Sequence, residues 1–341
     1  MASIPVSIVM PLRDAGNTLS AAIESLLAQT YPSIEIVLID HLSVDHSPDI
    51  IREFMAKDQR IRALTHSGSF VEAANLAWQK SSGDLIARMD CDDIAHPDRI
   101  AEQVNFLSQN PEVAACGTQV RILKRIEGGA SPPDPGYQRY EKWVNSVISS
   151  EDIRNQRFVD SPIPNPTSMI RREVMEALGG YQDPEWAEDY DFWLRLIEAG
   201  YRLGKVERKL LDWFDSEGRS TRTQERYALP LFQAAKATFL SRLPAIQQLG
   251  VVICGAGPIG KEMATLLRSH GIHIHAFLEV NHRQIGNRIA GIPVLDSEEF
   301  SKFPDNSVAL SAVGQDGARE RIRKLAIECG FSEGKDFFCV A

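Results

Sequence analysis

The chain has 341 residues, of which 43% are hydrophobic and 24% are charged, as is ordinary for a globular protein. This length is sufficient for two domains, each with a core of its own. The formal net charge of −9 argues against general binding of nucleic acid, because such binding requires a basic surface.

The N-terminal part of the chain alternates short apolar segments with amphipathic ones. The apolar segments predict strands over residues 5–10, 34–39, 61–65 and 85–89, and the helices between them are predicted to end near residues 29, 57 and 80. Apolar strands that alternate with helices are typical of a parallel sheet covered on both faces. We therefore predict a doubly wound α/β arrangement, in which ligands bind beyond the carboxyl ends of the strands.

The last of these strands runs directly into three carboxylates, Asp90, Asp92 and Asp93. Asp90 and Asp92 are two positions apart, so their side chains point the same way on extended backbone. Mg²⁺ and Mn²⁺ prefer oxygen ligands of this kind together with the phosphates of a substrate. The stretch alone indicates either a divalent-cation site or an acidic turn that only ends the strand.

The later part of the chain contains further elements and then a restart of the pattern. We predict strands over 113–123 and 201–214, a loop over 127–136, and helices over 97–109, 137–149 and 188–199, with a long helix ending at residue 243. A new strand, glycine turn and helix follow from about residue 246. The predicted domains are therefore residues 1–245 and 246–341.

Several segments up to about residue 225, taken in order, resemble family 2 glycosyltransferases with the GT-A fold. These segments are Val6–Pro11, Ser25–Pro32, Ile36–Asp40, Arg88–Asp93, Pro97–Arg99, Gly179–Tyr181 and Glu188–Arg195. The resemblance rests on their order and separation rather than on any one of them. It implies an α/β fold with a mixed sheet, like that of nucleotide-diphospho-sugar transferases.

The same resemblance implies a reaction and a donor site. The reaction is an inverting, metal-dependent transfer of a sugar from a nucleotide-diphosphate donor, expected to be a UDP-sugar, to a hydroxyl of a glycan or lipid-linked acceptor. Such transfers build surface polysaccharides and glycoconjugates. The implied contacts to the nucleotide-sugar are Pro11, Asp40, Arg88, Asp90 and Asp92. Asp90 and Asp92 are the implied ligands of Mn²⁺ or Mg²⁺, with Asp92 the direct one.

The resemblance also implies an acceptor side that contains Asn165, Glu188 and Asp189, with Asp189 as the general base. A sugar hydroxyl is a poor nucleophile, so a carboxylate within hydrogen-bond reach is needed to take its proton. Acidic residues in the first turn of a helix are also favoured by the helix dipole alone. A purely structural role for Asp189 therefore remains the alternative.

Two segments depart from the pattern of the family. His41 and Leu42 follow Asp40 where the family usually has an aspartate and a glycine, and Ala74 stands where an arginine is common. Two other functions stay open, the first because of these departures and the second because it shares a GT-A-like fold. One is a nucleotide-sugar-binding scaffold that has lost turnover, and the other is a sugar nucleotidyltransferase.

The C-terminal segment carries a second motif. Gly255, Gly257 and Gly260 form a Gly-x-Gly-x-x-Gly turn between a predicted strand and helix, which is the required context for binding the diphosphate of a dinucleotide. Glu279 stands where a ribose-binding acid is expected. The segment resembles small Rossmann-like nucleotide-binding domains of sugar-modifying enzymes. Binding of a nucleotide or nucleotide-sugar, a structural or docking role, and NAD-dependent catalysis all remain open.

Location is predicted from what the chain lacks. No apolar run approaches the roughly 18 residues of a membrane span, and the N-terminus does not resemble a signal peptide. The five cysteines form no Cys-x-x-Cys pair, so we expect reduced thiols and a cytoplasmic protein. Peripheral attachment to a membrane stays open.

Overall fold

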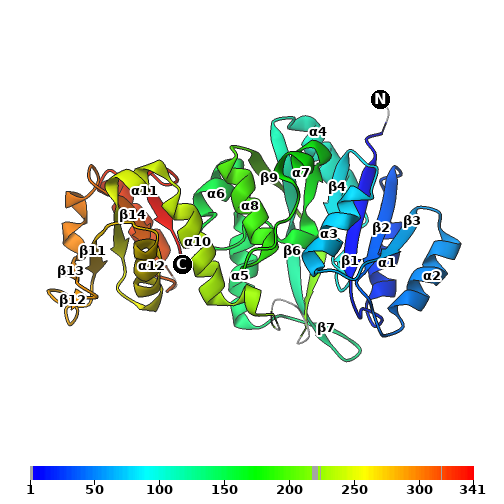
Figure 1. Ribbon diagram of the computed structural model, residues 1–341, viewed down its shortest axis with the longest axis horizontal. Helices are drawn as coiled ribbons and strands as arrows, with labels where there is room; N and C mark the ends of the chain where they lie inside the picture. The colour runs from blue at the N-terminus through cyan, green and yellow to red at the C-terminus, as the bar shows by residue number, and fades with distance from the viewer. Residues whose placement is uncertain (1–2, 217–221, 223, 316) are drawn as a thin grey trace. The chain divides into compact units, whose positions relative to one another are not determined.

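A computed structural model describes residues 3–216, 222, 224–315 and 317–341. The chain divides into two compact units, drawn from blue to green and from yellow to red over most of their length in Figure 1. The first unit comprises Met1–Ile153, Ile163–Pro184 and Glu188–Thr223, and the second comprises Arg154–Pro162, Glu185–Ala187 and Gln224–Ala341.

The first unit is built on a mixed sheet. Its strands are β1 (Val6–Leu12), β2 (Ile34–Asp40), β3 (Ile61–Thr65), β4 (Leu85–Arg88), β5 (Ile94–Ala95), β6 (Val113–Ile126), β7 (Gly129–Ser131), β8 (Met169–Arg171) and β9 (Arg202–Asp215). Its helices are α1 (Leu19–Leu27), α2 (Ser47–Lys57), α3 (Phe70–Gln79), α4 (Arg99–Gln109), α5 (Pro135–Ser146), α7 (Arg172–Leu178) and α8 (Glu188–Glu198), with a 3-10 turn η1 (Asn165–Thr167). Helix α6 (Ser150–Gln156) is divided between the two units.

The strand order explains where ligands can bind. The order is β3-β2-β1-β4-β8-β6-β9-β5, with β7 paired to β6, as Figure 1 shows for most of these strands. Strands β1 to β4 run parallel, and β8 is antiparallel to both of its neighbours. Because β1 lies between β2 and β4, the chain order reverses direction there. The carboxyl ends of β1 and β4 therefore flank the crevice in which open α/β sheets bind ligands.

Both faces of this sheet are covered, which accounts for the continuous apolar character of its strands. Every residue of β1 is buried. Ile8 and Met10 belong to one apolar cluster, whereas Val9 and Ile39 belong to a second. The predicted mixed α/β fold is confirmed.

Helix α5 lies along part of one edge of β6. The Asn145 side chain accepts a hydrogen bond from the Val120 amide at 2.9 Å and donates one to the Val120 carbonyl at 2.8 Å. Glu141 accepts from the Ile122 amide at 2.9 Å. Side chains of the helix thus satisfy backbone groups of the strand that would otherwise need a strand partner. The loop predicted just before α5 is partly wrong, because Gly129–Ser131 form β7 antiparallel to β6.

A buried lysine in the first unit should make stability depend on pH. Lys205 of β9 is almost fully buried and donates to the Val144 carbonyl at 2.5 Å, and burial lowers its pKa to about 7. In the unfolded chain Lys205 keeps its proton up to the ordinary lysine pKa. Burial of the charged lysine therefore destabilises the folded protein fully below pH 7, and this destabilisation fades as pH rises toward 10. We therefore expect the stability of wild type to rise, relative to Lys205→Met, by about 1.4 kcal/mol per pH unit over this range.

Urea unfolding of both proteins at pH 6, 7, 8 and 9 measures this difference. The substitution also removes the hydrogen bond to the Val144 carbonyl, which shifts the free energy of unfolding of the variant. This shift is the same at every pH, because methionine does not titrate. Stability curves of the two proteins that run parallel from pH 7 to pH 9 would contradict the prediction.

The second unit has a sheet of its own. Its strands are β10 (Val251–Cys254), β11 (Ile274–Glu279), β12 (Arg288–Ile289), β13 (Ile292–Asp296), β14 (Val308–Ser311) and β15 (Phe337–Cys339), in the order β12-β13-β11-β10-β14-β15. Its helices are α10 (Leu229–Ser241), α11 (Pro244–Leu249), α12 (Pro258–Ser269) and α13 (Ala318–Glu328), with 3-10 turns η2 (Glu225–Tyr227) and η3 (Ser297–Lys302). All pairs except β12 with β13 are parallel.

The main segment of the second unit begins at Gln224, whereas the predicted boundary follows residue 245. Helix α10 packs against α12, so it groups with the second unit by its contacts. The predicted boundary between functional domains, and the Rossmann-like character of the second, stay predictions. Within the described ranges, no helix is both long and apolar enough to cross a membrane.

Candidate active site

Three carboxylates gather just beyond the carboxyl end of β4. Oxygen atoms of Asp90, Asp92 and Asp93 all lie within 4.8 Å of one another. Asp90 and Asp92 are partly exposed, and Asp93 is buried. A set of carboxylate oxygens at one point fits Mg²⁺ or Mn²⁺, which bind through oxygen. The structure thus brings the two predicted ligands together and adds Asp93.

Neighbouring residues hold this acidic turn in place. The Asp93 carboxylate accepts a hydrogen bond from the Phe214 amide at 2.9 Å. The Arg125 guanidinium donates to the Asp92 carbonyl at 2.8 Å and lies 4.1 Å from the centre of the Phe214 ring. The run of acids could have indicated Asp93 from the sequence. Arg125 follows Asp92 by 33 positions, and no sequence signal pointed to it.

Arg88 contacts the acidic turn and is within electrostatic range of residues on the predicted acceptor side. It is buried, its Nη2 lies 2.9 Å from the Asp90 carboxylate, and its Nη1 donates to the Met89 carbonyl. Burial opposes its charge, but Asp90, and less strongly Tyr181 and Glu188, raise the pKa of the Arg88 guanidinium. Arg88 is therefore positioned to balance negative charge from both sides of the site.

The predicted nucleotide side lies at the ends of β1 and β2. Pro11 is buried within β1, and the next residue, Leu12, is paired with Asp40 at the end of β2. Asp40 is largely buried, and its carboxylate accepts from the Ser43 amide at 3.0 Å. One oxygen of Asp40 is thus committed to the loop that follows the strand.

That loop contains both departures from the family pattern that follow Asp40. His41 Nε2 lies 2.5 Å from the Gly68 carbonyl, so the ring donates to the loop before α3. Leu42 has φ of 54° and is 48% exposed. The Asp14 carboxylate accepts from the Val44 amide at 2.8 Å, which ties this loop to the one after β1. The histidine and leucine are therefore built into a defined loop.

The third departure also has a structural setting. Ala74 of α3 is buried in an apolar cluster, where an arginine could not be accommodated without burying its charge among apolar groups. The next residue, Asn75, donates to the Tyr181 carbonyl at 2.8 Å and accepts from the Tyr181 amide at 2.9 Å. Helix α3 thus holds Tyr181, the last residue of a segment that carries the family resemblance, in place through Asn75.

Tyr181 organises the acceptor side. Its hydroxyl donates to the Asn165 side chain at 3.0 Å. Burial raises the pKa of Tyr181, Arg88 opposes this shift, and Asp189 and Glu188 add to it, so all three lie within electrostatic range. Glu188 is buried, and Asp189 is partly exposed at the first turn of α8. Tyr181 thus bonds to Asn165 and lies within electrostatic range of Glu188 and Asp189, and the acceptor-side role of these three residues stays a prediction.

The third acid of α8 has a different setting. Asp191 is buried and accepts from Arg195 Nε at 2.6 Å. Arg195 also donates to the Gly180 carbonyl at 2.8 Å. This pair joins α8 to the end of α7, which gives Asp191 a structural role.

The glycine turn of the second unit follows β10. A Cβ on Gly260 would lie 2.0 Å from the Gly255 carbonyl oxygen, whereas a Cβ on Gly257 would meet no atom within 4 Å. Gly255 has φ of 104°. The Glu279 carboxylate accepts from the Ala256 amide at 3.0 Å. Glu279 is therefore bonded to the turn itself.

Two substitutions compare the glycine that has no room for a side chain with the one that has open space beside it. We expect Gly260→Ala to destabilise the second unit by at least about 1–3 kcal/mol, the cost of overpacking. Gly257 is the N-cap of α12 with φ of −75° and open space beside it, so Gly257→Ala should cost less, about 0.5–1 kcal/mol, through the poorer cap alone. Calorimetric melting of the full chain compares them, and equal effects would show that the turn is packed differently.

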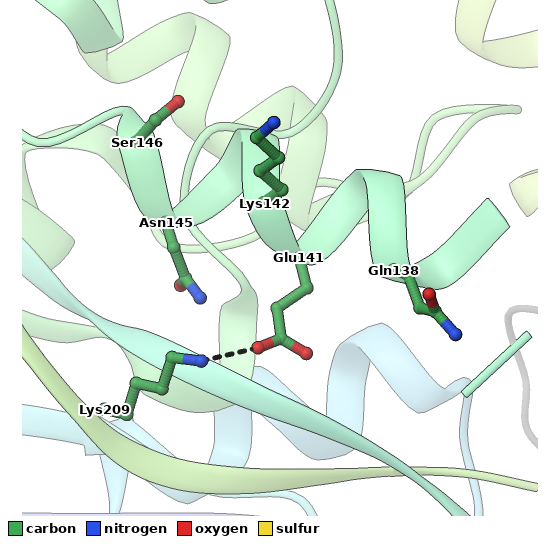
Figure 2. A pocket seen from close by; sticks show the side chains of 6 residues that line it. All are labelled: Gln138, Glu141, Lys142, Asn145, Ser146 and Lys209. Atoms are coloured by element: carbon green, nitrogen blue, oxygen red, sulfur yellow. Dashed lines mark hydrogen bonds and ion pairs between the residues drawn. The ribbon is translucent and has the colours of Figure 1, made fainter. Parts of the chain in front are cut away.

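A separate hollow of about 490 Å³ lies against α5 and β9. Figure 2 shows its lining residues: Gln138, Glu141, Lys142, Asn145, Ser146 and Lys209. Glu141 and Lys209 form an ion pair of 2.7 Å across it. None of the predicted site residues lines this hollow.

The chain is similar in sequence to known glycosyltransferases. The chain is 30% identical over 199 residues to an uncharacterized glycosyltransferase of Haemophilus influenzae, covering 57% of this chain and 61% of that protein. It is 26% identical over 197 residues to the O-antigen biosynthesis glycosyltransferase WbnJ of Escherichia coli, covering 56% of this chain and 71% of that protein. The alignments thus leave part of each protein unmatched.

Solved glycosyltransferases share the fold. The S. aureus protein TarS in complex with UDP-GlcNAc matches with a TM-score of 0.53 and 14% identity, over 78% of this chain and 72% of that chain. The Pyrobaculum calidifontis mannosyltransferase PcManGT, in complex with GDP-Man and Mn²⁺, matches with a TM-score of 0.51 and 18% identity, over 79% and 69%. The model of the family "Glycosyl transferase family 2" matches residues 7–179, about half of the chain. The chain belongs to glycosyl transferase family 2, with the GT-A fold.

Proposed function

We propose that the protein transfers a sugar from a UDP-sugar, with inversion, to a hydroxyl of a glycan or lipid-linked acceptor during synthesis of a surface polysaccharide. One observation carries this proposal. Arg88 contacts Asp90 at 2.9 Å and is within electrostatic range of Tyr181 and Glu188, which supports a single site shared by the acidic turn and the predicted acceptor side.

The donor is proposed to bind between the acidic turn and the loop after β2. Asp90 and Asp92 would hold Mg²⁺ or Mn²⁺, which when bound would neutralise charge on the departing diphosphate. Asp40 would accept from a hydroxyl or N–H of the nucleoside, and Arg88 would keep Asp90 oriented. Buried Asp93 would support the turn from behind.

Asp189 is proposed to act as the general base. The acceptor oxygen forms a bond to C1 of the sugar as the bond from C1 to the diphosphate oxygen breaks. The hydroxyl proton passes to the Asp189 carboxylate, and the nucleoside diphosphate leaves with the bonding pair. Attack opposite the leaving group inverts C1.

The compared proteins support the choice of chemistry. TarS was solved with UDP-GlcNAc and PcManGT with GDP-Man and Mn²⁺, and WbnJ is named for O-antigen biosynthesis. The five cysteines are free thiols, which supports the predicted cytoplasmic location.

Proton NMR of the purified protein with candidate donors tests the reaction. UDP-GlcNAc, UDP-glucose, UDP-galactose and GDP-mannose are supplied in turn with Mn²⁺ and simple sugar acceptors, and the anomeric configuration of each product is read. A product of inverted configuration supports the proposal, and retained configuration rejects the single displacement. Donor binding without turnover would favour the scaffold alternative.

For the second unit, we propose that the turn at Gly257 accepts a diphosphate group of a nucleotide. The open space beside Gly257 and the N-terminus of α12 support this proposal. The comparisons give no support for NAD. UDP binding that survives Asp92→Ala and is weakened by Gly257→Ala would favour this second site.

A further inference from the structure

A fully buried arginine lies beneath the acidic turn. Arg99 begins α4 and is 0% exposed. Its guanidinium donates to the Arg88 carbonyl at 2.5 Å, to Met89 Sδ at 3.2 Å and to Gln103 Oε1 at 3.2 Å. Two of these three acceptors belong to the residues that lead directly into the acidic turn. Arg99 thus fixes the backbone from which Asp90 projects.

The charge of Arg99 matches its place behind the carboxylates. Burial lowers the pKa of Arg99 to about 10, and Asp93 is the main group that opposes this shift. The guanidinium therefore stays charged at neutral pH. Three carboxylates with oxygens within 4.8 Å repel one another, and a fixed positive charge behind them offsets part of this repulsion.

The contacts of Arg99 continue through Gln103 to the acceptor side. Gln103 is buried and donates to the Thr167 carbonyl at 2.8 Å. Thr167 is the last residue of η1, the turn that begins with Asn165. Since Asn165 accepts from Tyr181, one path of side-chain contacts joins the acidic turn to the acceptor side.

We propose that Arg99 and Gln103 form a positioning relay that sets the distance and orientation between the metal-binding turn and η1. Both residues are fully buried, so they would act on the site without contacting a substrate. A planar guanidinium with fixed donors suits the task, because a lysine presents a compact ammonium on a flexible stem and cannot hold the same plane. The inference rests on the proposed function, since it requires that the acidic turn binds a cation with the donor.

Arg171 supplies a matched control. It donates to three carbonyls between the C-terminal end of α4 and the start of β6. These are the carbonyls of Leu107 at 2.8 Å, Val113 at 2.9 Å and Asn110 at 3.4 Å. Like Arg99, it ties α4 to backbone oxygens, but these contacts do not involve the acidic turn. Loss of either arginine should lower the melting temperature.

The experiment measures binding of Mn²⁺ and UDP to the full chain by calorimetry in four proteins: wild type, Arg99→Met, Arg99→Lys and Arg171→Met. We expect Arg99→Met to raise the Kd for Mn²⁺ in the presence of UDP by about 10- to 100-fold, as loss of outer-shell partners does elsewhere. Arg99→Lys should restore only part of the affinity. Arg171→Met should leave the Kd unchanged at a comparable loss of melting temperature.

Equal Kd values in Arg99→Met and Arg171→Met would overturn the relay and leave Arg99 a purely structural role. If Arg99→Met does not fold, Gln103→Leu replaces it, and an unchanged Kd for Mn²⁺ in the presence of UDP in that variant has the same meaning. Absence of Mn²⁺-dependent UDP binding in wild type would overturn the proposed function, and with it the relay. The two failures are therefore distinguished by the wild-type titration.

Discussion

Replacing Asp189 with Asn should lower kcat by about 10²- to 10⁴-fold, the usual contribution of a general base. The asparagine keeps the size of the side chain and the hydrogen bond from the Tyr190 amide, which is 2.7 Å long, so the first turn of α8 should be preserved. Donor affinity should change little, because the lost group acts on the acceptor. Steady-state kinetics and a UDP titration of the same preparation separate these two quantities.

Asp191→Asn is the control for this experiment. Both acids lie in the first turn of α8, so the helix dipole favours both. Asp191 is paired with Arg195 at 2.6 Å, and its loss should reduce stability while most turnover persists. If Asp189→Asn also loses only stability, the acid serves the helix and another group must be the base.

Replacing Asp92 with Ala should remove Mn²⁺-dependent binding of UDP. Asp92 is partly exposed and belongs to the turn at which the diphosphate is proposed to bind. We expect the affinity for UDP with Mn²⁺ to fall by at least about 100-fold, the upper end of the cost of losing an outer-shell partner. Turnover should fall with it, and calorimetric titration with and without Mn²⁺ measures the change.

Asp98→Ala controls for the loss of one negative charge near the turn. Asp98 precedes α4, and its side chain is 40% exposed beside Arg208. Asp98→Ala should leave the affinity for UDP unchanged, both with and without Mn²⁺. UDP binding that needs no Mn²⁺ and survives Asp92→Ala would move the nucleotide site away from the acidic turn, and complete absence of UDP binding would reject a UDP donor.

Much of the fold was predictable because its strands and helices have strong hydrophobic patterns. Strand β3 has the predicted ends, and α3 ends one residue before the predicted end, with a capping box formed by Ser69 and Glu72 at its start. The predictions missed two short elements, β7 with three residues and α6 with seven. Segments of this length carry too few residues to show a period, so pairing and packing decide their structure.

Residues of the candidate site could be proposed from the sequence only where they are close in sequence or resemble a family motif. Asp90 and Asp92 share one turn, and Asp189 lies in a segment of characteristic composition. Asn75 and Tyr181 are 106 positions apart, and Gln103 and Thr167 are 64 apart, yet each pair is hydrogen-bonded. No local pattern marks such pairs, because only the assembled sheet brings them together.

The loop after β2 is fixed in one conformation before any ligand binds. Leu42 holds a left-handed backbone conformation, which costs a residue with a side chain about 1–2 kcal/mol. Hydrogen bonds from Ser43 to Asp40 and from Val44 to Asp14 impose it during folding. Little conformational entropy is then left for a ligand to remove, so under the proposed function a nucleotide beside Asp40 would meet a loop that already holds its binding conformation.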